Sequence, residues 1–230
     1  MFTCKGDVRG EAMESMDNLK QTPLLLADIG NTHVHIYDGS TVEHLSYLDA
    51  LKQYASTPLY YICVKQQLLE EIGLVTAWKN LSSFIEIEGE YPTMGVDRKA
   101  LSLSRKEGVF VDAGSAITVD VVEEGVYKGG FILAGLQASL EAYGRISPAL
   151  ATTLERGLCL KSLPTTTKEQ ISYGIIASIK ALIKQHSKGK PLYFTGGDGL
   201  FLSRYFDGAT YDETLVFQGM IKSMKDKKLC

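Results

Sequence analysis

The sequence predicts an α/β protein made of two similar halves. An apolar strand, an Asp-x-Gly turn and a second strand occur around Asp28 and again around Asp112. Each copy closes on an acidic residue followed by glycine, a pair typical of β-hairpins. Apolar runs of strand length then alternate with helical patterns. Because a domain-sized interval separates the copies, we expect two related βββα-type halves rather than a solenoid.

Residues 22–107 are expected to form the first half and residues 108–230 the second, while the polar residues 1–21 are set aside as a disordered extension. The elements expected in the first half are strands at Leu24–Ile29, around Val34 and Ile36, at Leu59–Val64 and at Phe84–Ile87, and helices at Lys65–Ile72 and from about Asp97 to Lys106.

In the second half, we expect strand, turn and strand across Gly108–Asp120, strands at Gly130–Leu133 and Pro191–Thr195, helices at Leu136–Tyr143 and Lys168–His186, a short helix after the last strand, then Glu213–Phe217 and a terminal helix. The long helix should bury Ile171, Ile175, Ile179 and Leu182 on one face. Residues 148–164 lack periodicity and are expected to be loop-rich.

Composition limits the possible functions. The chain has 230 residues and a formal net charge of −3, with Lys and Arg scattered along it. It offers neither the basic patch of nucleic-acid binding nor the roughly 20-residue apolar run of a spanning helix. Its four cysteines form no CxxC pair, which argues against a zinc or redox motif and favours reduced thiols. We expect a cytoplasmic protein that acts on small molecules, with no nucleic-acid or membrane partner.

The Asp-x-Gly turns are suited to binding phosphate. In the turn Asp28–Thr32, glycine permits close approach, backbone N–H groups point at anionic oxygens, and the carboxylate suits Mg²⁺. A plain Asx hairpin is the alternative. Aligning Asp28 with Asp112 places Gly30 on Gly114 and Val34 on Thr118. The recurrence favours phosphate binding, because two like turns facing each other clamp one phosphate chain.

Two further segments are candidates. The segment 195–198, Thr-Gly-Gly-Asp, follows an expected strand, where a backbone without Cβ atoms admits adenine or ribose, although an ordinary strand-to-helix turn is the alternative. Asp97 and Arg98 supply a base for an acceptor hydroxyl and a fork for a carboxylate, although such a pair is also common at helix starts. His33 and His35 are expected at the surface. The chain contains no GxxxxGK[ST] motif, which excludes a P-loop kinase.

In this order, the motifs resemble those of the type III pantothenate kinases, in the actin-like ATPase superfamily, over essentially all of residues 24–222. The matching segments are Asp28–Thr32, Gly95–Arg98, Asp112–Asp120, Gly129–Leu136 and Thr195–Gly197. The resemblance implies a duplicated ribonuclease H-like fold with mixed sheets and βββαβα-type halves. It also implies phosphorylation of pantothenate by ATP, the first step of coenzyme A synthesis, in a homodimer that requires Mg²⁺ and K⁺ or NH₄⁺.

The resemblance also implies roles for individual residues. Asp97 would be the catalytic proton acceptor. The implied ATP contacts are Asp28, Ile29, Gly30, Asn31, Thr32, His33, Val34, His35 and Ser115, and the glycine cluster adds Gly196 and Gly197. The implied substrate contacts are Tyr91, Gly95, Val96, Asp97, Arg98 and, from the partner subunit, Thr167, with the register among Thr165, Thr166 and Thr167 open. Asp28 would lie near Mg²⁺ and Asp112 at K⁺.

Three positions depart from the family pattern. Ser115 replaces the usual Thr but keeps the hydroxyl, Ala134 replaces a Pro, and the spacer between Tyr91 and Gly95 is short. Two other functions stay open: a kinase of the same fold that acts on a sugar or short-chain acid, and an ATP-binding regulator of transcription without catalysis. Retention of the three aspartates disfavours the regulator.

Overall fold

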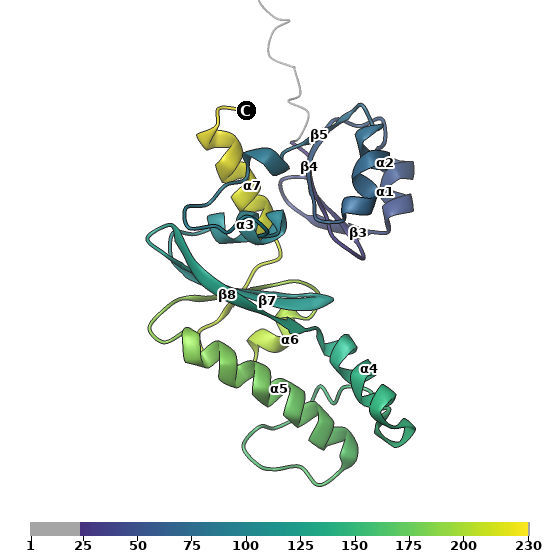
Figure 1. Ribbon diagram of the computed structural model, residues 1–230, viewed down its shortest axis with the longest axis vertical. Helices are drawn as coiled ribbons and strands as arrows, with labels where there is room; N and C mark the ends of the chain where they lie inside the picture. Colours follow the sequence, from purple (N-terminus) through teal and green to yellow (C-terminus); the bar gives the residue numbers. More distant parts are fainter. Residues whose placement is uncertain (1–23, 230) are drawn as a thin grey trace, which may run out of the picture.

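The computed structural model describes residues 24–229, whose strands form two five-stranded sheets of the same topology (Figure 1). The first has the order β3-β2-β1-β4-β5, and the second has the matching order β8-β7-β6-β9-β10. In each sheet, an antiparallel three-stranded meander is extended by two strands parallel to its first strand. The duplication expected from the sequence is therefore confirmed. The expected extension, residues 1–21, lies outside the described residues.

The strands of the first half are β1 (Leu26–Ile29), β2 (Val34–Tyr37), β3 (Val42–Leu45), β4 (Leu59–Cys63) and β5 (Trp78–Asn80). Its helices are α1 (Tyr47–Tyr54), α2 (Leu69–Gly73) and α3 (Val96–Leu103), with 3₁₀ turns at Gln66–Leu68 and Ser82–Phe84. Ala27 and Ile29 of β1 are buried in the core beneath α1 and α2. Since strand residues alternate, Asp28 faces the other side of the sheet.

The first half differs from expectation in two places. Phe84–Ile87 is not a strand, because the fifth strand is Trp78–Asn80, which pairs in parallel with β4. Ile85 and Ile87 are buried, so their alternation reflects an irregular segment packed into the core. Helix α1 was not expected, although Ser46 caps it by accepting a hydrogen bond from Asp49 N at 3.2 Å.

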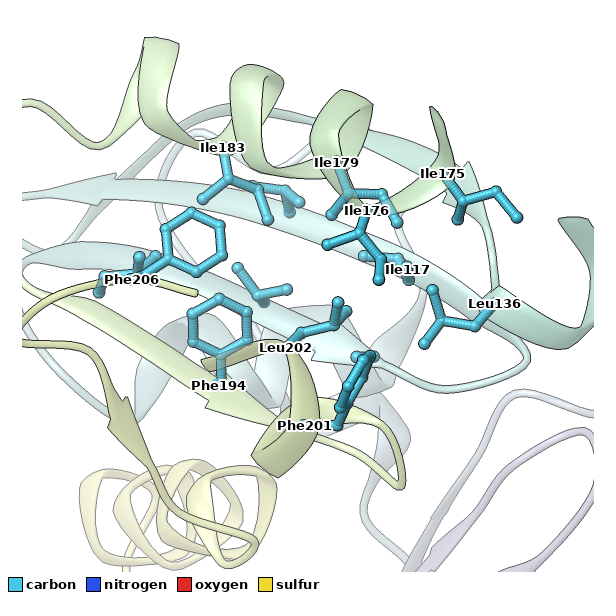
Figure 2. Close-up of a cluster of buried hydrophobic side chains, with 14 of the residues drawn as sticks. Ile117, Leu136, Ile175, Ile176, Ile179, Ile183, Phe194, Phe201, Leu202 and Phe206 are labelled. Carbon is cyan, nitrogen blue, oxygen red and sulfur yellow. The ribbon is translucent and has the colours of Figure 1, made fainter. Parts of the chain in front are cut away.

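The second half contains β6 (Gly108–Ala113), β7 (Ala116–Glu123), β8 (Val126–Ala134), α4 (Leu136–Ile146), α5 (Thr167–His186), β9 (Leu192–Thr195), α6 (Gly199–Ser203), β10 (Thr210–Tyr211) and α7 (Leu215–Asp226), with a 3₁₀ turn at Pro148–Leu150. Helix α5 covers one face of the sheet, where isoleucines at helical spacing meet Ile117 and Phe194 of the strands (Figure 2). This apolar layer makes the second sheet a rigid base for the turn after β6.

Two details of the second half also differ from expectation. Leu182 is 38 % exposed, and Ile183 is buried in its place, because the buried stripe continues from Ile179 at the same four-residue spacing. Helix α7 begins at Leu215, so it includes most of the segment Glu213–Phe217 that the sequence set apart from it. Residues 151–166 are irregular, as expected for the loop-rich stretch.

Helices α3 and α7 lie on the face of the second sheet opposite α5 and reach the first sheet (Figure 1). They share one core with residues of both halves, including Leu26 of β1 and Phe110 of β6. The ends of β1 and β6 therefore open towards α3. In the part of the chain that the structure describes, no helix combines the length and the apolar character needed to cross a bilayer.

Candidate active site

The two Asp-x-Gly turns meet between the sheets. Thr32 Oγ1 and Ser115 Oγ lie 3.0 Å apart and share a hydrogen bond. The turns differ in length, since Asp28 pairs with His35 across its hairpin, whereas Asp112 pairs with Thr118. The second turn is one residue shorter, so the expected alignment of Val34 with Thr118 is wrong. The contact brings two hydroxyls from different halves to one point.

Two half-buried carboxylates, Asp28 and Asp112, lie in the strands that lead into these turns. Asp28 Oδ1 is buried and has no hydrogen-bond partner within residues 24–229. Burial raises the pKa of Asp28 well above its usual range, and the charges of Asp97 and Asp112 raise it further. Burial likewise raises the pKa of Asp112 to about 7, with Asp97 and Asp120 contributing. These carboxylates repel one another, which is the situation that a bound cation relieves.

The glycine turn after β9 packs directly on Asp112. Gly196 has φ +82°, and a Cβ there would overlap Asp112 Oδ1 and lie 2.7 Å from Ala113 O. Asp198 N donates to the same carbonyl at 2.9 Å. Glycine is therefore required at this position both by the left-handed backbone and by the close approach.

Next to the carboxylates is a cavity of about 260 Å³ between the halves. Its lining comes from Asp28, His35, Val42 and His44 on one side and from Asp112, Thr195, Gly196, Gly197, Tyr211, Glu213, Val216 and Phe217 on the other. His35 Nδ1 lies 2.6 Å from His44 Nδ1, and His44 Nε2 lies 3.6 Å from Glu213 Oε2. Burial and the neighbouring histidines lower the pKa of His35 to about 4, so it is neutral at pH 7.

Asp97 lies in the first turn of α3, which begins after Gly95. Its Oδ1 accepts a hydrogen bond from Arg98 N at 2.7 Å, which orients the carboxylate. Burial raises the pKa of Asp97, although the Arg98 backbone N–H and charge oppose the shift. A Cβ on Gly95 would lie 2.5 Å from Asp97 Oδ1. Any larger residue at position 95 would therefore clash with the Asp97 carboxylate in its present orientation.

The Arg98 side chain lies in a polar cluster beside Asp97. Its Nε and Nη2 atoms donate to the two carboxylate oxygens of Asp120, at 3.1 and 2.6 Å. Nη2 also donates to Tyr127 Oη at 3.3 Å, and Nη1 donates to Tyr91 Oη at 2.7 Å. Arg98 is 6 % exposed and Asp120 is fully buried. The fork that the sequence assigned to a substrate carboxylate is thus occupied by a carboxylate of this chain.

Some expected site residues lie outside this arrangement. The side chains of Ile29 and Val34 are buried in the first core, so they offer only backbone atoms to a ligand. His33 is exposed as expected, but His35 lines the cavity and is not a surface residue. Thr167 begins α5, on the far side of the second sheet from α3 (Figure 1). Within one chain, it does not join Asp97.

Sequence reasoning assigned no role to several residues that the fold brings to the site. Asp120 and Tyr127 contact Arg98, while His44, Tyr211 and Glu213 line the cavity. For Asp120 a signal existed, because an acidic residue within the apolar run of β7 must be paired when the strand is buried. His44, Tyr211 and Glu213 belong to no sequence motif, and only the packing of the two halves brings them to the cavity.

Comparison with known proteins agrees with this geometry. The family model described as type III pantothenate kinase matches residues 64–188. Two relatives named type III pantothenate kinase, from Helicobacter hepaticus and Wolinella succinogenes, are 42 % and 39 % identical. The alignments cover 88 % and 89 % of this chain, and 98 % of each relative.

Comparison with solved structures supports the fold. A Campylobacter jejuni protein described as a Baf family transcriptional activator is similar with a TM-score of 0.81 and 37 % identity, over 90 % of this chain and all of that one. A 2-dehydro-3-deoxygalactonokinase from Sinorhizobium meliloti, at TM-score 0.53 and 11 % identity over 89 % of this chain and 99 % of its own, is similar in fold alone. The expected actin-like ATPase fold is confirmed. The chain belongs to the type III pantothenate kinase family.

Proposed function

We propose that this protein transfers the γ-phosphoryl group of ATP to pantothenate, yielding 4′-phosphopantothenate and ADP, the first step of coenzyme A synthesis. One observation carries the proposal. At the point where the turns of the two halves meet, burial raises the pKa of Asp28 and the charges of Asp97 and Asp112 raise it further, so the three carboxylates lie close together. Membership of the family supports pantothenate as the acceptor.

The ATP phosphates are proposed to bind between the turns, on residues 28–35 and Ser115. The contact of Thr32 with Ser115 supports this, since two hydroxyls 3.0 Å apart present donors to one phosphate chain. Gly196 and Gly197 are assigned to the adenosine side. A Cβ on Gly197 would meet no atom within 4 Å, which leaves space for a flat ligand.

Cations are proposed at two carboxylates, Mg²⁺ near Asp28 and K⁺ or NH₄⁺ at Asp112. The donor set fits a hard cation, because Asp28 Oδ1 is buried without a partner in the described part of the chain. Within residues 24–229, no group of three or more His, Cys, Asp or Glu is arranged to hold a metal. This favours cations shared with phosphate oxygens, where they supply positive charge.

In the proposed reaction, Asp97 accepts the proton of the acceptor hydroxyl. The hydroxyl oxygen bonds to the γ-phosphorus as the bond from that phosphorus to the β,γ-bridging oxygen breaks, and ADP leaves. Burial raises the pKa of Asp97, which makes its carboxylate a stronger base than an exposed one. The hydrogen bond from Arg98 N holds Oδ1, so that the carboxylate keeps one orientation during the transfer.

Gly95, Val96, Arg98 and Tyr91 are proposed to line the acceptor site. Gly95 and Val96 surround Asp97 at the start of α3, and the Arg98 guanidinium contacts Tyr91. We further propose a cytoplasmic homodimer in which the partner's Thr167 completes the site. The position of Thr167 on the far side of the second sheet supports a contribution from a second copy rather than from the same chain.

An ATP-consumption assay with pantothenate tests the function on the wild type, Asp97→Asn and a matched control, Asp49→Asn. Asp49 is exposed on α1, away from the proposed site. Loss of the base should lower kcat by about 10²–10⁴-fold at saturating pantothenate, while Asp49→Asn keeps wild-type turnover. Near-normal turnover of Asp97→Asn would remove Asp97 from the role of base.

Replacing K⁺ by Na⁺ tests the monovalent cation. Asp112 is half-buried and lies near the charges of Asp97 and Asp120, so the proposed K⁺ offsets charge that would otherwise oppose binding of the phosphates. We expect activity to collapse in Na⁺-only buffer and to return on titration with KCl. Full activity without K⁺ or NH₄⁺ contradicts a monovalent-cation site at Asp112.

One observation favours a second candidate, an ATP-binding regulator of transcription without catalysis. The C. jejuni structure that is 37 % identical to this chain is described as a transcriptional activator. Calorimetric titration with ATP separates the two candidates. Binding of ATP without transfer to pantothenate would favour the regulator, whereas pantothenate-dependent ADP formation favours the kinase.

A further inference from the structure

The cluster around Arg98 contains a fully buried carboxylate, Asp120, that the proposed reaction does not use. Asp120 lies on β7, opposite Gly130 of β8. A Cβ on Gly130 would lie 2.6 Å from Asp120 Oδ1 and 3.0 Å from Arg98 Nη2. The strand thus leaves room for the ion pair only because residue 130 has no side chain.

The Arg98 guanidinium has five N–H groups, and four of them have partners. Two donate to Asp120, one to Tyr127 and one to Tyr91. Within residues 24–229, one N–H of Nη1 is left. Tyr91 Oη accepts from Nη1, so its own proton is free to be donated. Tyr91 is 37 % exposed, whereas the atoms around Asp120 are buried.

We propose that Asp120 is a positioning residue for acceptor recognition: by holding the Nε and Nη2 edge of Arg98, it presents Nη1–H together with Tyr91 O–H as a two-donor receptor for a carboxylate. The inference rests on the proposed function and names how its acceptor is selected. The carboxylate would bind beside the fork of Arg98 rather than in it.

The charges support this arrangement. Asp120 neutralises Arg98, so the pair places no uncompensated cation beside the base. Without Asp120, a buried guanidinium would have the Asp97 carboxylate as its alternative partner, since the charge of Arg98 already acts on Asp97 and opposes the rise in its pKa. The two donors would then no longer be presented to the acceptor carboxylate. Asp97, paired with the guanidinium, would no longer be free to accept a proton. Asp120 therefore acts through Arg98, without touching the substrate.

The test compares two acceptors, pantothenate and its neutral alcohol analogue, in which a hydroxymethyl group replaces the carboxylate. For Asp120→Asn, we expect kcat/KM for pantothenate to fall by about 10-fold or more, mainly through KM. For the analogue, we expect a change of less than about threefold, since it has no carboxylate to receive. KM for ATP should stay unchanged.

Asp38→Asn is the matched control, because Asp38 holds a hairpin turn through Ser40 and Thr41. It should leave the ratio of kcat/KM between pantothenate and the alcohol analogue unchanged.

An equal loss for both acceptors overturns the inference, because a merely structural role lowers both. A wild type that phosphorylates neither acceptor overturns the proposed function, and the inference with it. If Asp120→Asn does not fold, Tyr91→Phe tests the same receptor at an exposed residue. It should reduce the preference for the carboxylate by about 10-fold. An unchanged preference in that variant overturns the inference as well.

Discussion

At the scale of one residue, Asp112 shows how a residue of the proposed site destabilises the fold. Partial burial, together with the charges of Asp97 and Asp120, raises the pKa of its carboxyl from 3.8 to about 7. In the fold, Asp112 therefore keeps its proton at pH 5, where the unfolded chain releases it. The pKa values of Asp28 and Asp97 are raised in the same direction. Burial thus opposes ionisation at the site, and an ion-free protein carries this cost at neutral pH.

The raised pKa of Asp112 makes the stability of the ion-free protein depend on pH in one direction. Because the folded state binds the proton more tightly, the contribution of Asp112 to the free energy of unfolding decreases as pH rises from about 4 to about 7. We expect the ion-free wild type to lose urea stability between pH 5 and pH 8, and Asp112→Asn to lose less. Urea midpoints in buffer without Mg²⁺ or K⁺ measure this. Identical slopes for the two proteins would contradict the raised pKa.

At the scale of elements, the crossing of α3 and α7 holds the proposed base in place. Helix α7 approaches α3 so closely that a Cβ on Gly219 would overlap the Ala100 carbonyl. Ala100 and Leu101 of α3 share a core with Met220 and Met224 of α7. Because Asp97 lies in the first turn of α3, the position of its carboxylate depends on this contact.

Two glycine substitutions test the crossing. Gly219→Ala should destabilise the protein by about 1–3 kcal/mol, since the added methyl forces the helices apart. Gly174→Ala on α5 is the matched control, because its Cβ would meet only Tyr143 Oη at 3.8 Å. It should be neutral, or stabilising by up to about 1 kcal/mol through helix propensity. Equal thermal midpoints for the two variants would contradict the close crossing.

At the scale of the whole molecule, the turns of two sheets with the same topology converge beside α3. We propose residues 22–107 and 108–230 as the two halves. Helix α7 belongs to the second half in sequence, yet it packs on α3 and shares a core with β1. The halves are therefore coupled through α7, and the cavity between them depends on how they pack.

Mixing two inactive variants tests the proposed homodimer. If the partner's Thr167 completes each site, a dimer of one Asp97→Asn and one Thr167→Ala subunit has one doubly altered site and one intact site. Random exchange of equal amounts should then restore about a quarter of wild-type activity. Size-exclusion chromatography confirms the dimer. No recovery after verified exchange would mean that Thr167 acts within its own subunit, whereas full activity of Thr167→Ala by itself would mean that another of the three threonines makes the contact.

The sequence by itself determined the architecture and the positions of the turns. Strands, glycines and acidic residues repeat in order, and apolar periodicity marked helix α5 and the strands around Asp28 and Asp112. These features were predictable because they are local: a turn needs its glycine and a buried strand its apolar residues. Element boundaries and the irregular segment around Ile85 were missed, since core packing overrode the local pattern there.

Only the tertiary structure decided how these segments meet. The contact of Thr32 with Ser115, the effect of Asp97 and Asp112 on the pKa of Asp28 and the pairing of Arg98 with Asp120 all join residues far apart in the chain. The sequence assigned the fork of Arg98 to a substrate, whereas the fold gives it to Asp120. The physical reason is burial: a guanidinium removed from water needs a partner carboxylate, and the packing of β7 and β8 against α3 determines which one is within reach.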